Sequence, residues 1–126
     1  MIYALFERGY VEDGLEDMIR YAHRRGLEVL LEVHTEDEFA LSLNSGADLI
    51  GVNNRDLKTL KVDLGVTMRV LSRYYGGRVV VSESGICSPE DVRFLHECGA
   101  RAFLVGTSIM TAESVREKVR ELVEAI

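Results

Sequence analysis

The sequence has little of what membrane, secreted and disordered proteins contain. Its 126 residues include one proline, two cysteines and no tryptophan. No apolar run approaches the roughly 18 residues that cross a bilayer, and the first residues lack the basic segment and cleavage site of a signal peptide. One proline and no low-complexity run argue against disorder. Cys87 and Cys98 show neither a metal nor a redox spacing, so we expect reduced thiols in a cytoplasmic protein.

Basic side chains are also in the minority. Lys and Arg total 15 and Asp and Glu total 21, which gives a net charge of −6. This balance argues against a nucleic-acid partner, and no segment suggests a membrane partner. Hydrophobic residues make up 47% of the chain, enough to form the core of a single domain over residues 1–126.

Short apolar runs alternate with amphipathic segments along the whole chain. The runs are apolar on both faces, as in parallel strands covered on both sides. The predicted strands are 2–6, 28–33, 48–53, 78–83 and 101–105. The predicted helices are 12–25, a segment capped by Thr35 with Glu38 completing a capping box, 64–74 capped by Asp63, a segment capped by Ser88, and 112–125 capped by Thr111. Left-handed glycines are predicted before strands at Gly26, Gly46, Gly77 and Gly99.

This alternation predicts an α/β fold with a parallel sheet. A (β/α)₈ TIM barrel has about 250 residues in eight units, so four units come to about 125 residues. An open flavodoxin-like sheet fits the same length. Length and periodicity therefore leave both architectures open.

Polar side chains stand at the carboxyl ends of the predicted strands, where parallel α/β folds place their sites. Glu32 and Glu83 each lie in an apolar run, and burial there would raise their pKa values and suit them to acid–base chemistry. Asn53 and Arg55 follow the next strand and could hold a substrate carboxylate or keto group. The same residues also suit a turn, in which Asp56 pairs with Arg55. His34 is interpreted as an ordinary loop residue.

Two loops of small residues follow the last two strands. They are Ser84-Gly85 and Gly106-Thr107-Ser108. TIM barrels often bind phosphate with the loops after their last two strands, so a phosphate site is favoured over glycines that serve only tight turns. No metal-ligand cluster and no nucleotide-binding loop is present, so we expect no cofactor and no metal. The expected ligand is a phosphorylated small molecule or free phosphate.

Four blocks together carry a family resemblance. They read LLEVHTEDE, GADLIGVNNRDLKTL, VVSESGI and FLVGTSIM. In order and spacing they resemble indole-3-glycerol phosphate synthase, a carbon–carbon lyase of tryptophan biosynthesis with a single (β/α)₈ barrel. The resemblance covers almost the whole chain. IGVNNRDL and SESGI are fairly specific, whereas many phosphate-binding barrels share GTS.

The resemblance implies half of a barrel, from the family's fourth strand through its eighth helix. It implies ring closure of carboxyphenylamino-deoxyribulose phosphate with loss of carbon dioxide and water. It implies that Glu32 and Asn53 are catalytic, with Glu32 as the acid–base group. It also implies that Arg55, Glu83 and Ser84 contact the substrate and that Gly85, Gly106 and Thr107 hold its phosphate.

The family's first three strands and their lysines have no counterpart in the chain, whose lysines are Lys58, Lys61 and Lys118. We therefore expect the isolated chain to be inactive without an N-terminal half-barrel. Exposed sheet edges should favour self-association into a homo-oligomer. Two other functions stay open: a non-catalytic truncated or engineered half-barrel that retains a phosphate site, and a different phosphate-handling barrel such as an isomerase or an epimerase.

Overall fold

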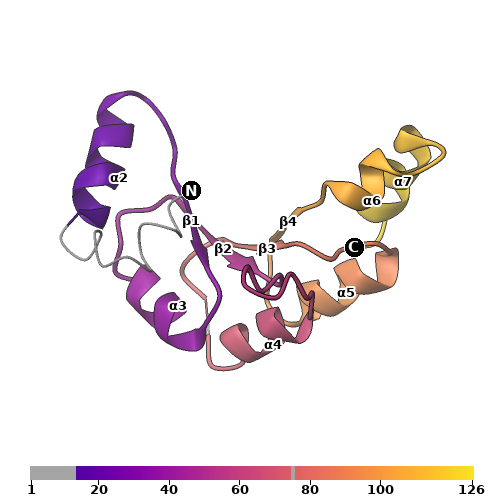
Figure 1. The fold of residues 1–126 in the computed structure, drawn as a ribbon, viewed down its shortest axis with the longest axis horizontal. Coiled ribbons are helices and arrows are strands. Elements are labelled where there is room, and N and C mark those ends of the chain that lie inside the picture. Colours follow the sequence, from indigo (N-terminus) through magenta and orange to yellow (C-terminus); the bar gives the residue numbers. More distant parts are fainter. Residues whose placement is uncertain (1–13, 75) are drawn as a thin grey trace.

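Strands and helices alternate along the chain (Figure 1). The computed structural model describes residues 14–74 and 76–126. Its strands are β1 (Leu30–Val33), β2 (Leu49–Asn53), β3 (Val80–Glu83) and β4 (Ala102–Leu104). Its helices are α2 (Leu15–Arg24), α3 (Glu36–Ser42), α4 (Gly65–Leu71), α5 (Pro89–Glu97), α6 (Thr107–Met110) and α7 (Val115–Val123). Four predicted strands are confirmed in shorter form, and the predicted strand 2–6 lies outside the described residues.

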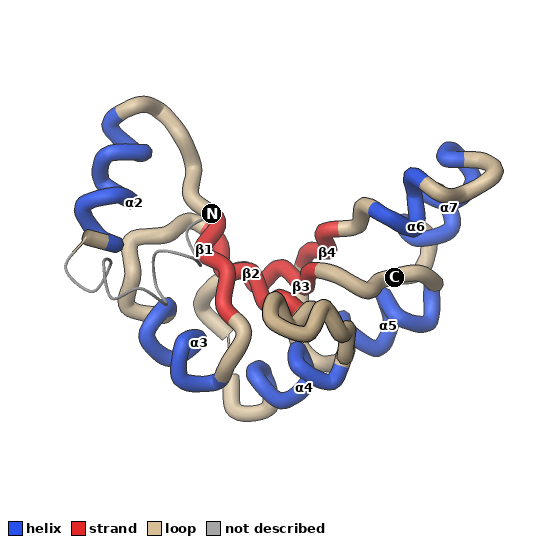
Figure 2. The backbone as a smooth tube through the Cα atoms, viewed as in Figure 1, coloured by secondary structure: helices blue, strands red, loops and turns tan. Residues whose placement is uncertain are grey.

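The strands form one parallel sheet in the order β1-β2-β3-β4, which is the order of the sequence. A doubly wound sheet reverses its strand order at a switch point, and no reversal occurs here. Because parallel crossovers are right-handed, an unreversed order places successive helices on one face. Figure 2 shows α3, α4 and α5 along the same side of the strands. The chain therefore forms part of a (β/α)₈ barrel, and the flavodoxin-like alternative is wrong.

The core lies between the sheet and its helices. Ile50, Val52 and Val80 are 0% exposed, and they pack with side chains from α3 and α4 such as Phe39 and Val70. Burying each such side chain stabilises the fold by about 1.5–3 kcal/mol. The strands pack against the helices through this face of the sheet. The opposite face is therefore available for polar residues.

The predicted start of α5 is confirmed. Ser88 accepts a hydrogen bond from the Asp91 backbone N–H, and the Asp91 carboxylate completes the capping box, with Pro89 at the first turn. Thr35 caps α3 as expected. The Glu38 carboxylate, however, accepts from the backbone N–H of His34, one residue earlier than a capping box requires.

Other helix boundaries differ from those predicted. The residue before α4 is Leu64, whose side chain caps nothing, and Asp63 accepts instead from the Gly65 N–H at 2.9 Å. Ser114 caps α7, because Thr111 closes the extra short helix α6 and donates to the Thr107 carbonyl. Gly26, Gly77 and Gly99 have positive φ as predicted, whereas Gly46 does not.

The described residues contain no helix long and apolar enough to cross a membrane. Cys87 and Cys98 are both free thiols.

Arg78 ties the amino end of β3 to the α3–β2 connection. Its guanidinium donates to the carbonyls of Leu43 at 3.3 Å, Ser45 at 3.1 Å and Ala47. The planar fork of arginine suits several acceptors at once, and these carbonyls stand just past the end of α3. Arg78 therefore stabilises the sheet at the end opposite to the polar strand ends.

We predict that Arg78→Lys lowers the free energy of unfolding by about 1–2 kcal/mol, because an ammonium cannot serve all three carbonyls. Urea unfolding followed by circular dichroism measures the change. Arg73→Lys, at an exposed position, is the matched control and should leave the stability unchanged. Equal stability of the two variants would contradict this role of Arg78.

Candidate functional site

The predicted polar strand ends lie at one edge of the sheet. Parallel pairing places Glu32 opposite Gly51, and Asn53 opposite Glu83. Residues that pair, or that stand two apart along a strand, share a face. These four residues therefore lie on the same face, and it is the face turned away from the helix-packed core residues Ile50 and Val52.

Glu32 and Asn53 are in direct contact. The Asn53 amide donates through Nδ2 to Glu32 Oε1 at 2.5 Å, and its Oδ1 accepts from the Arg55 backbone N–H at 2.9 Å. Asn53 is 7% exposed, so its orientation is fixed by both bonds. The Glu32 side chain is 38% exposed, and the expectation that it is buried is wrong. The reason is that β1 is an edge strand among the described residues, so no neighbouring strand covers the carboxylate there.

Glu83 is the buried carboxylate of the site. It is 4% exposed, and its Oε1 has no hydrogen-bond partner among the described residues. Burial, together with the negative charge of Glu32, raises the pKa of Glu83 to about 7. At neutral pH both the acid and the carboxylate forms are therefore well populated, which is what proton transfer at that pH requires.

Gly51 makes room for this carboxylate. A Cβ added at Gly51 would lie 1.9 Å from Glu83 Oε1. The acidic side chain thus occupies the space that a side chain at residue 51 would fill. The sequence gives no sign of this role, because an isolated glycine within a strand is read as a weak point of the sheet.

His34 has closer neighbours in the site than its sequence context indicated. Its ring is 11% exposed, with Nε2 3.5 Å from Glu32 Oε1 and Nδ1 3.8 Å from Glu38 Oε2. The available signal was the spacing of Glu32 and His34, which two residues apart share one side of the chain. His34 lies in the loop after β1 as predicted, and the structure adds that its ring stands between two carboxylates.

The Ser84–Gly85 turn follows β3 in a left-handed conformation. Ser84 has φ +67° and Gly85 has φ +83°. A Cβ added at Gly85 would lie 2.2 Å from Val62 Cγ1 of the β2–α4 loop. Backbone and packing therefore both require a glycine at residue 85, whatever it binds.

Gly106 differs from Gly85 in this respect. Its φ is −120°, and no described atom lies within 4 Å of a Cβ added there. Neither turn geometry nor packing among the described residues explains this glycine. Gly106 and Thr107 are exposed at the start of α6, and Ser108 Oγ donates to the Ile86 carbonyl at 2.8 Å, which holds α6 against the loop after Gly85. The two predicted phosphate loops are thus neighbours.

Arg55 is engaged within its own loop. Its guanidinium donates to the Leu60 carbonyl at 3.1 Å, and its backbone bridges to Val62 in antiparallel fashion. The Asp56 carboxylate accepts from the backbone N–H groups of Thr59 and Lys58, each at 2.8 Å, and these bonds lower the pKa of Asp56. NNRD therefore does form a turn, but Asp56 is bonded to backbone N–H groups and does not pair with Arg55 as predicted.

Asn54 is predicted from the sequence to belong to that loop as well. It is instead 1% exposed, and its side chain bonds to Thr67 and Ser82 in the core. An asparagine beside another asparagine after a strand gives no sign of which one is buried.

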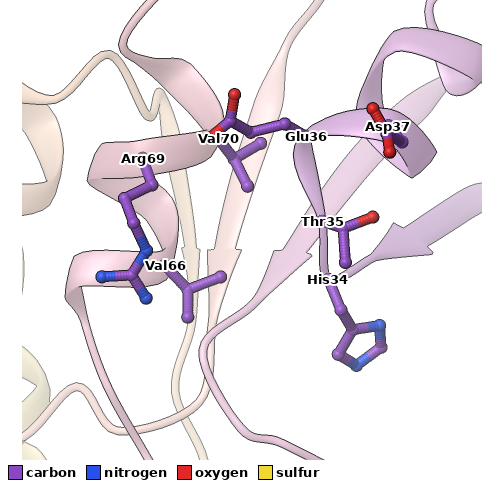
Figure 3. A pocket seen from close by; sticks show the side chains of 7 residues that line it. All are labelled: His34, Thr35, Glu36, Asp37, Val66, Arg69 and Val70. Atoms are coloured by element: carbon purple, nitrogen blue, oxygen red, sulfur yellow. The ribbon is translucent and has the colours of Figure 1, made fainter.

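A cavity of about 400 Å³ lies beside the site, between the start of α3 and α4 (Figure 3). Its lining consists of residues 34–37 and of Val66, Arg69 and Val70, and none of the predicted site residues is among these. Within the part of the chain that the structure describes, no group of three or more His, Cys, Asp or Glu side chains is arranged to hold a metal ion.

The family model and the curated relatives that match this chain carry the same family name. The family model for indole-3-glycerol phosphate synthase matches residues 4–122. The chain is 44% identical to the indole-3-glycerol phosphate synthase of Caldanaerobacter subterraneus over 92% of its length, and 42% identical to that of Methanocaldococcus jannaschii over 90%. It covers 44% and 42% of those two proteins, so the chain spans less than half the length of these curated relatives.

Solved structures of lower identity share the fold. Thiamine phosphate pyrophosphorylase from Pyrococcus furiosus superposes with a TM-score of 0.70 at 22% identity, over 88% of this chain and 53% of that chain. N-acetylmannosamine-6-phosphate 2-epimerase from Clostridium perfringens gives a TM-score of 0.57 at 16% identity, over 86% and 47%. At these identities the similarity shows the fold alone.

The raised pKa of Glu83 predicts how stability depends on pH. A carboxyl whose pKa is about 7 when folded and near 4.5 when unfolded holds its proton longer in the folded state. Its contribution to stability is therefore fully present below about pH 4.5 and is lost as the pH rises to about 7. The difference in unfolding free energy between the unmodified chain and Glu83→Gln should fall across this range and then stay constant.

Urea unfolding between pH 4.5 and 8.5 measures this difference. Glu28→Gln, at an exposed position, is the control, and its difference from the unmodified chain should not follow that course. A difference for Glu83→Gln that does not change with pH would show that Glu83 ionises normally in the folded protein.

Proposed function

The chain belongs to the indole-3-glycerol phosphate synthase family, and from this premise we propose that it supplies half of such an active site. The reaction proposed is the family's ring closure of carboxyphenylamino-deoxyribulose phosphate, with loss of carbon dioxide and water. The half proposed runs from the fourth strand through the eighth helix of the barrel. The observation that carries the proposal is the cluster of Glu32, Asn53 and Glu83 on one face of the sheet.

In this proposal the two glutamates have different roles in proton transfer. Glu32 is exposed and accepts a hydrogen bond from the Asn53 amide, and it is proposed to accept a proton from the substrate. Glu83 is buried with a pKa of about 7, so it can offer its carboxyl proton to a substrate oxygen. Glu83, Ser84 and Arg55 are the proposed contacts to the rest of the substrate.

The phosphate group is proposed to lie against Gly85, Gly106 and Thr107. Gly106 has no conformational or packing requirement for glycine among the described residues, and a close approach of a ligand to its backbone would supply one. The Ser108 bond to the Ile86 carbonyl brings both loops to the same place. A TIM barrel commonly binds phosphate with two such loops.

The chain provides acids for this reaction but few cations. Lys118 donates to the Cys87 carbonyl and to Glu121, both at 3.2 Å, so it holds the α5–α7 side of the fold. Ring closure at a carbonyl needs a positioned acid and a cation for the developing charge. We therefore propose that the 126-residue chain alone is inactive and that an N-terminal half-barrel supplies the lysines.

A second function is favoured by the position of the phosphate loops. Both loops lie wholly within this chain, so phosphate binding without turnover is the expected property of a non-catalytic half-barrel.

The cytoplasmic location and the absence of a nucleic-acid partner stay predictions from the sequence.

Complementation tests the catalytic proposal. We expect the chain mixed with a family N-terminal half-barrel to form indole-3-glycerol phosphate, measured by indole fluorescence, while each part alone forms none. Glu32→Gln should lower the rate of the mixture by at least about 100-fold, as expected when a general acid–base group is removed. Glu28→Gln is the matched control. A folded, stable complex without activity would favour the non-catalytic half-barrel.

The unpaired edges of the sheet and the exposed leucines on its end strands predict self-association. Among the described residues, β1 and β4 each pair on one side only, and Leu30 and Leu104 are 37% and 55% exposed. Open edges and apolar faces favour pairing with another chain. Light scattering of the chain at micromolar concentration should therefore give the mass of a dimer or a larger oligomer. A stable monomer would contradict the prediction.

A further inference from the structure

The side chain of Asn54 makes a complete set of hydrogen bonds. Nδ2 donates to Ser82 Oγ at 3.0 Å and to the Ser84 carbonyl at 3.2 Å. Oδ1 accepts from the backbone N–H of Thr67 at 3.2 Å and from its hydroxyl at 2.8 Å. Two donors and two acceptors exhaust the capacity of a side-chain amide. A buried amide satisfied in this way is held in a single orientation.

The hydroxyl groups of Thr67 and Ser82 close a ring with this amide. They lie 2.9 Å apart, and both residues are 0% exposed. The Thr67 hydroxyl gives its only proton to Asn54 Oδ1, so Ser82 must donate to Thr67. Each member of the ring thus donates to the next, an arrangement in which hydrogen bonds strengthen one another. We call Asn54, Thr67 and Ser82 the Asn54 ring.

The Asn54 ring also explains the start of α4. Leu64 precedes that helix and offers no side-chain cap, so the first-turn N–H groups need other acceptors. Asn54 Oδ1 takes the N–H of Thr67 from the end of another element, β2. The ring therefore fixes α4 against the carboxyl ends of β2 and β3.

On its other side, Asn54 holds three consecutive residues at the end of β3. Besides its bonds to Ser82 and Ser84, its backbone N–H donates to the Glu83 carbonyl at 2.9 Å. Ser84 has φ +67°, which is uncommon for a residue other than glycine. Such a conformation persists only where the surroundings impose it. The bond from Asn54 Nδ2 to the Ser84 carbonyl is a restraint of that kind.

We infer that Asn54 is a positioning residue, which fixes the left-handed turn at Ser84–Gly85 in the shape that receives the phosphate group of the substrate. This inference rests on the proposed function and deepens it, since it assigns the support of the phosphate turn to a residue that contacts no ligand. Asn53 and Asn54 then have separate tasks: Asn53 faces Glu32, and Asn54 holds the turn from inside the core.

Asn54→Asp and Thr67→Val test this division. Asn54→Asp keeps the shape of the side chain but loses the donor to the Ser84 carbonyl. Thr67→Val also breaks the ring, yet it leaves the bonds from Asn54 to Ser84 and Glu83 in place. Both variants should be less stable in urea. Only Asn54→Asp should shift the NMR signals of Ser84 and Gly85 and weaken the binding of inorganic phosphate, by about tenfold.

A second substitution provides the rescue. Glycine adopts positive φ without restraint, so adding Ser84→Gly to Asn54→Asp should restore the Gly85 signal. The inference is overturned if Asn54→Asp leaves the turn unchanged, or if Thr67→Val disturbs it equally. If Asn54→Asp alone does not fold, the Ser84→Gly background decides, and a turn that does not recover there contradicts the inference. An unmodified chain that binds no phosphate would count against the proposed function, whereas the NMR comparison would still decide the role of Asn54.

Discussion

The pairing of β2 with β3, which sets Asn53 opposite Glu83, is the constraint on which the rest of the site depends. A shift by one residue would turn Ile50 and Val52 away from the helices and would expose the core. Because these residues and Val80 are fully buried against α3 and α4, the register is strongly specified. The apolar face thus determines which polar residues appear together on the opposite face.

That opposite face carries a cost that stability alone does not explain. Glu83 is buried, its Oε1 lacks a hydrogen-bond partner among the described residues, and a nearby acid disfavours its charged form. Gly51 leaves the space that the carboxyl needs, at the expense of a weaker strand. A strained or costly group that the surroundings preserve is characteristic of functional sites. Arg78, at the opposite end of the sheet, adds stability where no site residue lies.

The regular parts of this structure were predictable from local patterns. Four strands and the Ser88 cap follow from short-range periodicity and capping chemistry, which depend on neighbouring residues only. The predicted caps Asp63 and Thr111 were wrong because α4 begins after Leu64 without a side-chain cap, and α7 begins later in the chain with Ser114 as its cap. The burial of Asn54 and the exposure of Glu32 depend on which strands and helices are neighbours in space. No window of sequence contains that information.

The proposed site is therefore supported unevenly. The turn at Ser84–Gly85 is held by Asn54, which directly follows β2 and is itself bonded to Ser82 of β3 and Thr67 of α4. Glu32 stands on β1, with a neighbouring strand on only one side in the part that the structure describes. The proposed phosphate end can therefore keep its shape through contacts within this chain. The proposed acid–base end lies on β1, where a further strand could still pair with the sheet. For the proposed roles, the contacts within this half-barrel therefore support binding of the substrate's phosphate more fully than they support the acid–base chemistry.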